Sequence, residues 1–183
     1  MKGQVIALPG GVMPAAVRYA PLQSALGDEV DFHFKDLEVY AEDEPPPGYS
    51  VEQEVTALAR FADTLQLRRF HLVGYSGGGF VSLAFAGTYP ERLHSLAVFE
   101  PARVPGPLGP EEAALDRKLR QGLAGAEGPE FMRAFTSLQV RQGVELPPPA
   151  GPPPPWMGQR PLRLAAMLRP VGEYRFYRNQ LRG

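Results

Sequence analysis

Residues 69–79 of the chain read Arg-Phe-His-Leu-Val-Gly-Tyr-Ser-Gly-Gly-Gly, a mostly apolar run that is followed by Ser76 and three glycines. The apolar run has the length of a buried strand, and the mostly apolar residues 77–88 predict a buried helix. Residues 74–78 (Gly-Tyr-Ser-Gly-Gly) match the pattern G-x-S-x-G at this junction. A match placed between a strand and a helix predicts a strained turn that exposes the hydroxyl of Ser76.

This turn supplies the chemistry that a nucleophilic serine needs. Gly77 begins the helix, where unpaired N–H groups and the helix dipole favour negative charge, so its N–H could hold an oxyanion beside Ser76. The loop at residues 8–14 follows another predicted strand, and Gly11 or Val12 could offer a second donor there. The alternative is that both are ordinary glycine-rich turns that pack a helix on a strand.

The sequence on either side of this turn predicts an α/β fold. Strands are expected at 4–8, 30–34, 69–75 and 94–99. A capping box at Ser50 and Gln53 starts an amphipathic helix over residues 51–66. Alternation of strands and helices predicts a mostly parallel sheet of about four strands, covered on both faces as a three-layer sandwich.

The chain changes character after Glu100, because no further run is typical of a strand. Helices are expected at about 110–123, 129–142, 161–169 and 172–181, with a proline-rich segment at 146–155. We therefore predict two domains, which are a core over residues 1–103 and a helical cap or lid over residues 104–183.

Composition narrows the class of protein. The 183 residues carry a net charge of −1 and no cysteine, so neither nucleic acid nor a membrane surface is expected as a partner, and thiolate chemistry is excluded. The N-terminal apolar run at 5–8 is too short for a secretory signal or a membrane span. No spacing of His, Asp or Glu is typical of a metal site. A cytoplasmic protein is the expectation.

Residues 69–79, followed by Tyr-Pro-Glu-Arg-Leu-His-Ser-Leu-Ala-Val-Phe-Glu-Pro at 89–101, resemble the α/β-hydrolase family. The resemblance covers residues 4–101 and implies that Ser76 is the nucleophile, that Gly11 and Gly77 form the oxyanion hole, and that no cofactor is used. The two leading strands of the family are not found here. The family order is serine, acid, histidine, which implies that the acid and the histidine lie beyond residue 183.

None of the three histidines is a good candidate for the base. His71 lies five residues before Ser76 on one strand, roughly 16 Å away, and His94 starts its own strand, so both belong to the opposite edge of the sheet. His33 is expected two strands away, roughly 10 Å off. For the acid, Glu100 at the end of a neighbouring strand is the one candidate, although a structural glutamate at the pocket rim is the favoured interpretation.

Two groups of cap residues have both a functional and an ordinary interpretation. The arginines could line the mouth of a site for an acidic substrate, although solvated helix faces are favoured. They are Arg160, Arg163, Arg169, Arg175, Arg178 and Arg182. An apolar group could shape an acyl pocket, although ordinary cap core is favoured. It comprises Phe131, Phe135, Trp156 and Met157.

Two functions follow from this interpretation. The first is a serine hydrolase that acts on a small carboxylic ester, or a similar acyl compound, through an acyl-enzyme on Ser76. The alternative is a truncated, catalytically incomplete protein that acts as a binding or interaction module. A peptidase, thioesterase or lactonase would also fit the fold, whereas Ser76 excludes an Asp nucleophile. The outer edge of strand 94–99 is left open, which would allow pairing with a second copy.

Overall fold

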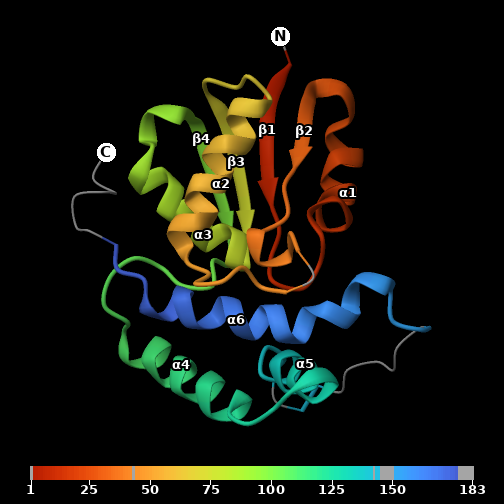
Figure 1. Cartoon of the computed structure of the whole chain (residues 1–183), viewed down its shortest axis with the longest axis vertical. Coiled ribbons are helices and arrows are strands. Elements are labelled where there is room, and N and C mark those ends of the chain that lie inside the picture. The colour runs from red at the N-terminus through yellow and green to blue at the C-terminus, as the bar shows by residue number, and fades with distance from the viewer. Residues whose placement is uncertain (1, 43, 142, 145–150, 177–183) are drawn as a thin grey trace. The chain divides into compact units, whose positions relative to one another are not determined.

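Four strands form one parallel sheet in the order β2-β1-β3-β4 (Figure 1). They are β1 Gly3–Leu8, β2 Val30–Phe34, β3 Phe70–Tyr75 and β4 Leu93–Phe99. The register pairs Leu8 with Gly74 and Tyr75 with Phe99, so the carboxyl ends of β1, β3 and β4 meet at one edge of the sheet. Each predicted strand is confirmed to within one residue at either end, and the α/β fold with a parallel sheet is confirmed.

The computed structural model describes residues 2–42, 44–141, 143–144 and 151–176. The chain divides into two compact units, the first comprising Met1–Pro105 together with Arg163–Gly183, and the second Gly106–Leu162. The predicted division into a core over 1–103 and a cap over 104–183 stays a prediction, and in the structure the last segment groups with the first unit. The physical reason is that Leu164 and Met167 are buried against loops of the first unit.

Three helices accompany the sheet in the first unit, namely α1 Ala15–Leu26, α2 Val51–Thr64 and α3 Ser76–Thr88. The predicted capping box begins α2, where the Ser50 side chain accepts from the Gln53 N–H and the Gln53 side chain accepts from the Ser50 N–H. Helices α2 and α3 pack against each other on one face, and right-handed crossovers place α1 on the other. Helix α1 was not predicted, because it contains Pro21 and lacks an amphipathic pattern.

The second unit holds α4 Pro110–Leu123, α5 Gly128–Ser137 and the short 3₁₀ helix η4 Pro155–Gln159. The prediction for α4 is confirmed, and α5 ends five residues before the predicted position 142. Leu138 packs so closely on α4 that a Cβ at Gly122 would lie 2.8 Å from its Cδ1. Residues 146–150, the first half of the proline-rich segment 146–155, lie outside the described residues, and η4 begins at its last residue, Pro155.

One helix, α6 Arg160–Glu173, replaces the two that were predicted at 161–169 and 172–181. Pro170 lies inside it, and a proline there removes one N–H and crowds the carbonyl four residues earlier. Buried Leu164, Met167 and Val171 nevertheless continue one apolar stripe through this position, and packing of such a stripe can outweigh one lost hydrogen bond. Residues 177–181 of the second predicted helix lie outside the described residues.

Among the described residues, no helix is both long enough and apolar enough to cross a bilayer.

Candidate active site

Ser76 lies where strand β3 ends and helix α3 begins without an intervening loop. Its backbone φ is +50°, in the left-handed region that a non-glycine residue adopts only at some cost in energy. The side chain is half-buried. The structure therefore places Ser76 at the strained strand-to-helix turn that the sequence pattern predicted, at the carboxyl edge of the sheet.

Glycines make this turn possible because backbone segments cross it at close range. A Cβ at Gly74 would lie 2.6 Å from the Gly78 carbonyl oxygen and 2.8 Å from the Gly79 Cα. The Gly78 N–H donates to the Pro9 carbonyl at 2.9 Å, which fastens the loop after β1 to the start of α3. A Cβ at Gly10 would lie 3.2 Å from the Ser76 Cβ. Gly10 was not predicted as a site residue, yet it lies against Ser76.

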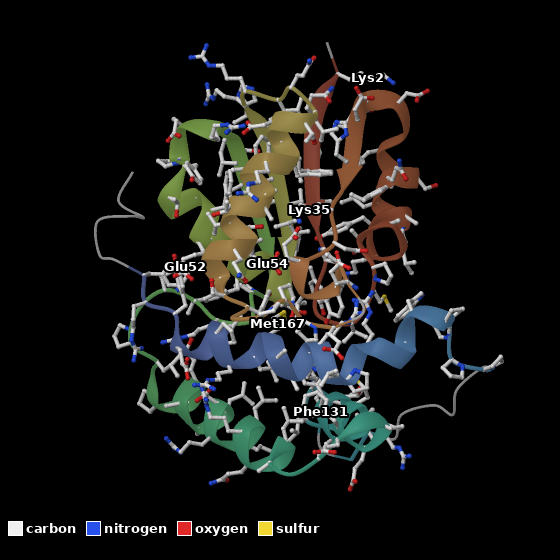
Figure 2. All side chains as sticks on the ribbon, viewed as in Figure 1. Lys2, Lys35, Glu52, Glu54, Phe131 and Met167 are labelled. Carbon is white, nitrogen blue, oxygen red and sulfur yellow. The ribbon has the colours of Figure 1, made fainter. Side chains whose placement is uncertain are left out.

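The two expected oxyanion donors, Gly11 and Gly77, share one neighbour on helix α6. A Cβ at Gly77 would lie 2.8 Å from the Met167 Sδ, and one at Gly11 would lie 2.9 Å from the Met167 Cε. Leu164 also contacts Gly11. Figure 2 shows Met167 on α6, beside the loops at the ends of the strands. The structure thus brings Gly11 and Gly77 together under one thioether, although their role as oxyanion donors stays a prediction.

Tyr40 anchors the loop that carries Gly11. It ends the 3₁₀ helix η2, Glu38–Tyr40, and its hydroxyl donates to the Gly11 carbonyl. Nearby, the Tyr19 hydroxyl donates to the Leu8 carbonyl at 2.8 Å. Burial raises the pKa of Tyr19 to about 12, so this phenol stays a donor at neutral pH. Two tyrosines therefore fix the chain on either side of Pro9.

A buried carboxylate, Glu54 on α2, holds η2 in place. It is 1% exposed, and its oxygens accept from the N–H groups of Glu38 (2.9 Å) and Val39 (3.2 Å) and from the Tyr49 hydroxyl (2.7 Å). Desolvation by burial raises the pKa of Glu54, although these hydrogen bonds oppose the shift. The sequence analysis did not single out this residue, because an isolated glutamate on an amphipathic helix usually faces solvent.

We expect Glu54→Gln to lower the free energy of unfolding by about 1–3 kcal/mol at acidic pH, because the Gln NH2 group cannot accept from a backbone N–H, whereas the hydroxyl oxygen of a protonated carboxyl can. A folded-state pKa raised above the unfolded value of about 4.3 means that folding favours the protonated carboxyl. The contribution of the protonated Glu54 carboxyl to the stability of the folded state is therefore fully present below about pH 4, and it is lost as the pH rises through the folded pKa. Urea unfolding between pH 4 and pH 8 measures this difference.

The matched control is Glu52→Gln on the same helix, where the carboxylate is exposed (Figure 2). We expect this change to alter the free energy of unfolding by less than about 0.5 kcal/mol at every pH. An advantage of the wild type over Glu54→Gln that grows with pH would contradict the raised pKa.

Glu100 follows β4 directly and lies next to the strand-to-helix turn at residues 74–78, called the elbow below, because Phe99 pairs with Tyr75. Its φ is +44° and it is exposed. Two residues on, the Ala102 N–H donates to the Ser76 carbonyl at 2.9 Å. The structure thus brings the Glu100 backbone to the same edge as Ser76. Whether its carboxylate serves as the acid stays a prediction.

None of the three histidines lies beside Ser76 at the carboxyl edge of the sheet. His71 approaches the Ser95 Oγ at 2.8 Å, and its ring centroid lies 5.3 Å from that of His94. His33 approaches the Gln4 Oε1 at 2.7 Å, and its register with Ile6 sets it four residues, or roughly 13 Å, short of Ser76 along the strands. The geometry offers Ser76 no histidine base from this chain.

The cap arginines have different surroundings. Arg169 is 82% exposed at its side chain and pairs with Glu173 at 3.0 Å, as expected for a solvated helix face. Arg160 and Arg163 are instead 4% and 2% exposed, so the favoured solvated interpretation is wrong for these two. In the second unit, the rings of Phe131 and Phe135 stack at 6.4 Å.

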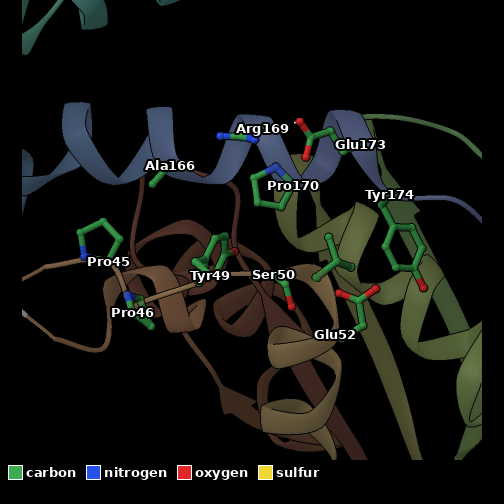
Figure 3. Close-up of a pocket in the computed structure, with 12 residues that line it drawn as sticks. Pro45, Pro46, Tyr49, Ser50, Glu52, Ala166, Arg169, Pro170, Glu173 and Tyr174 are labelled. Atoms are coloured by element: carbon green, nitrogen blue, oxygen red, sulfur yellow. Dashed lines mark hydrogen bonds and ion pairs between the residues drawn. The ribbon is translucent and has the colours of Figure 1, made fainter.

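A cavity of about 580 Å³ lies in the first unit between residues 45–52, which run from a loop into the start of α2, and helix α6 (Figure 3). Pro45, Pro46 and Tyr49 face Pro170 and Tyr174 across it, and Ser76 is not among its lining residues. In the part of the chain that the structure describes, no group of three or more Asp, Glu or His side chains could hold a metal ion.

A parallel sheet with a serine on a strained strand-to-helix turn defines the class of α/β hydrolases. The sequence model for the α/β hydrolase fold matches residues 6–145 of this chain. The chain therefore belongs to the α/β hydrolase fold family, as the resemblance in residues 69–101 predicted.

The relatives include proteins named as hydrolases and one Bacillus subtilis protein assigned as a 2-succinyl-6-hydroxy-2,4-cyclohexadiene-1-carboxylate synthase, to which the chain is 44% identical over 50 residues. The chain is 31% identical over 98 residues to a Caulobacter segnis protein assigned as carbamate hydrolase RutD, which covers 52% of this chain and 37% of that protein. It is 48% identical over 50 residues to the 2-hydroxy-6-oxo-2,4-heptadienoate hydrolase of Pseudomonas putida, covering 27% of this chain and 18% of the relative.

Solved structures show the same fold. The carboxylesterase CesB of Bacillus subtilis aligns with a TM-score of 0.58 at 19% identity, covering 98% of this chain and 55% of that one. A membrane phospholipase A, described as a bacterial virulence factor, aligns with a TM-score of 0.58 at 22% identity and covers 91% and 51%. The chain thus spans about half the length of these structures, and less of the relatives named above.

Proposed function

We propose that this chain carries the nucleophile and the oxyanion hole of a serine hydrolase that acts on a small carboxylic ester or a similar acyl compound. The observation that carries the proposal is the positive φ of Ser76 at the first position of α3, with Gly10 against its Cβ. That geometry sets the half-buried Ser76 side chain beside the backbone N–H groups of a helix start. Relatives named for carbamate and dienoate hydrolysis support acyl chemistry.

The proposed reaction proceeds through an acyl-enzyme. The Ser76 Oγ bonds to the carbonyl carbon while its proton passes to a general base, and the N–H groups of Gly11 and Gly77 hold the oxyanion. The bond to the leaving alcohol breaks, and the alcohol departs with that proton. Water then gives a proton to the base and adds to the acyl carbon, which releases the carboxylic acid and restores Ser76. We propose that the base is a group other than His33, His71 and His94.

One specific observation favours the alternative function. All three histidines are set back along the strands from Ser76, and each contacts another side chain. A chain with an elbow and no base could bind acyl compounds without hydrolysing them, as a binding module. The two functions differ in whether Ser76 is activated.

Labelling with a fluorophosphonate, followed by intact mass measurement, distinguishes these functions. We expect the protein, purified at its native length, to form one adduct that Ser76→Ala abolishes. The matched control is Ser24→Ala, since Ser24 is an exposed serine on α1, and this variant should label as the wild type does. A native protein without an adduct, or an adduct that persists in Ser76→Ala, would overturn the hydrolase proposal. An absent adduct would favour the binding module.

The outer edge of β4 is open among the described strands, and Phe99 there is 56% exposed. Pairing of this edge with a second copy stays a prediction that gel filtration with light scattering can test. That the substrate is a small acyl compound also stays a prediction.

A further inference from the structure

Arg163 on α6 is a buried cation that the protein satisfies only in part. It is 2% exposed, and its Nη1 donates to the Tyr40 carbonyl at 3.1 Å. Its Nε and Nη2 are buried and have no hydrogen-bond partner among the residues that the structure describes. A buried guanidinium with unmet donors destabilises a fold strongly unless an anion satisfies it. The exposed Arg169 on the same helix, in contrast, has a carboxylate partner in Glu173.

Arg163 is connected to the proposed active site through a single residue. Tyr40 accepts from Arg163 with its carbonyl and donates to the Gly11 carbonyl with its hydroxyl. Leu164, the next residue on α6, contacts Gly11 directly. All four residues belong to the first unit. Arg163 is therefore linked through Tyr40, and through its neighbour Leu164, to the loop that would hold the oxyanion.

We propose that Arg163 binds a carboxylate of the substrate, and that the substrate is the monoester of a short dicarboxylic acid or a similar carboxylate-bearing acyl compound. This inference rests on the proposed function for its placement beside Ser76. The planar guanidinium offers Nε and Nη2 as a fork that matches the two oxygens of a carboxylate. Leu164, which follows Arg163 on α6, contacts Gly11, and Met167 contacts both Gly11 and Gly77. These apolar side chains suit the short carbon chain that joins the two ends of such a substrate.

The test is a calorimetric binding titration with glutarate, which carries two carboxylates and has no ester bond to hydrolyse. The neutral analogue glutaramide is titrated in parallel. We expect glutarate to bind the wild type and glutaramide to bind at least 10-fold more weakly. We expect Arg163→Met to weaken glutarate binding about 10- to 100-fold, as for the loss of a charged, bidentate contact. The matched control Arg169→Met should bind glutarate as the wild type does.

A purely structural role for Arg163 predicts a different result. If its function were to hold Tyr40, Arg163→Met would lower the melting temperature. We expect the melting temperature without ligand to stay equal or to rise, because an unmet buried charge is replaced by an apolar side chain of similar length. Arg163→Lys, which keeps the charge and loses the fork, should bind glutarate at least several-fold more weakly than the wild type and provides a second variant should the first not fold.

Two outcomes would overturn the inference: equal binding of glutarate and glutaramide by the wild type, or unchanged glutarate binding in both Arg163 variants. Because the titration requires no turnover, its result is separable from the labelling of Ser76. Glutarate binding without a Ser76 adduct would keep the carboxylate site and reject the hydrolase. An adduct without glutarate binding would keep the hydrolase and reject this substrate class.

Discussion

Replacing Gly78 by alanine is expected to lower the free energy of unfolding by about 3 kcal/mol and to abolish labelling of Ser76. A Cβ at this position would lie 2.7 Å from both the carbonyl carbon and the carbonyl oxygen of Leu8, and would also meet the Pro9 carbonyl oxygen. All of these are backbone atoms, so no side chain can rotate to make room. Overpacking of this kind costs about 1–3 kcal/mol, and strain on the hydrogen bond from Gly78 to Pro9 adds about 1 kcal/mol.

Urea unfolding of the wild type and Gly78→Ala measures this difference, and fluorophosphonate labelling reports on the elbow. The control is Gly158→Ala, because a Cβ at Gly158 would meet nothing within 4 Å. We expect that change to shift the free energy of unfolding by less than about 0.5 kcal/mol. A loss below about 1 kcal/mol in Gly78→Ala would show that the loop after β1 is not held against α3 as described.

Much of the fold was predictable because its signals are local. A strand such as β1 is a short apolar run that ends in glycines, and the start of α2 is marked by the side chains of Ser50 and Gln53 themselves. The elbow combines both kinds of signal, since Ser76 requires small neighbours within a few residues on either side. Patterns of this kind determine the local backbone structure, and for this reason the predicted strands agree with the observed ones to within one residue at either end.

The parts that the sequence did not predict depend on contacts between distant residues. Nothing in the glycine-rich loop distinguishes Gly10 from its neighbours. Only the pairing of β1 with β3 brings Gly10 against Ser76. Met167 and Arg163 belong to a helix with an ordinary mixed composition. Only the packing of α6 on the first unit shows that one side chain covers Gly11 and Gly77 and that the other is buried. A proline inside α6 further suggested two helices where there is one.

Replacing Phe80 by alanine is expected to lower the free energy of unfolding by about 3–5 kcal/mol, the usual cost of removing a buried phenylalanine ring. Phe80 lies on α3, four residues after Ser76, and is 0% exposed. Its ring meets those of Tyr174 and Phe176 edge to face, at centroid distances of 5.7 and 5.3 Å. These contacts connect the segment after α6 to the helix that begins at the elbow.

A double-mutant cycle tests that connection more sharply than the single change. Phe80→Ala and Tyr174→Ala should be coupled by about 0.5–1.5 kcal/mol in urea unfolding, as measured for edge-to-face aromatic pairs. The control is Leu115→Ala, because Leu115 is 60% exposed and should contribute less than about 0.5 kcal/mol. Additive costs for Phe80 and Tyr174 would mean that the residues after α6 do not pack on α3. Coupling would instead assign the end of α6 to the hydrolase core, because an aromatic pair couples only when its rings are held in contact. The same packing of α6 sets Met167 against Gly11 and Gly77.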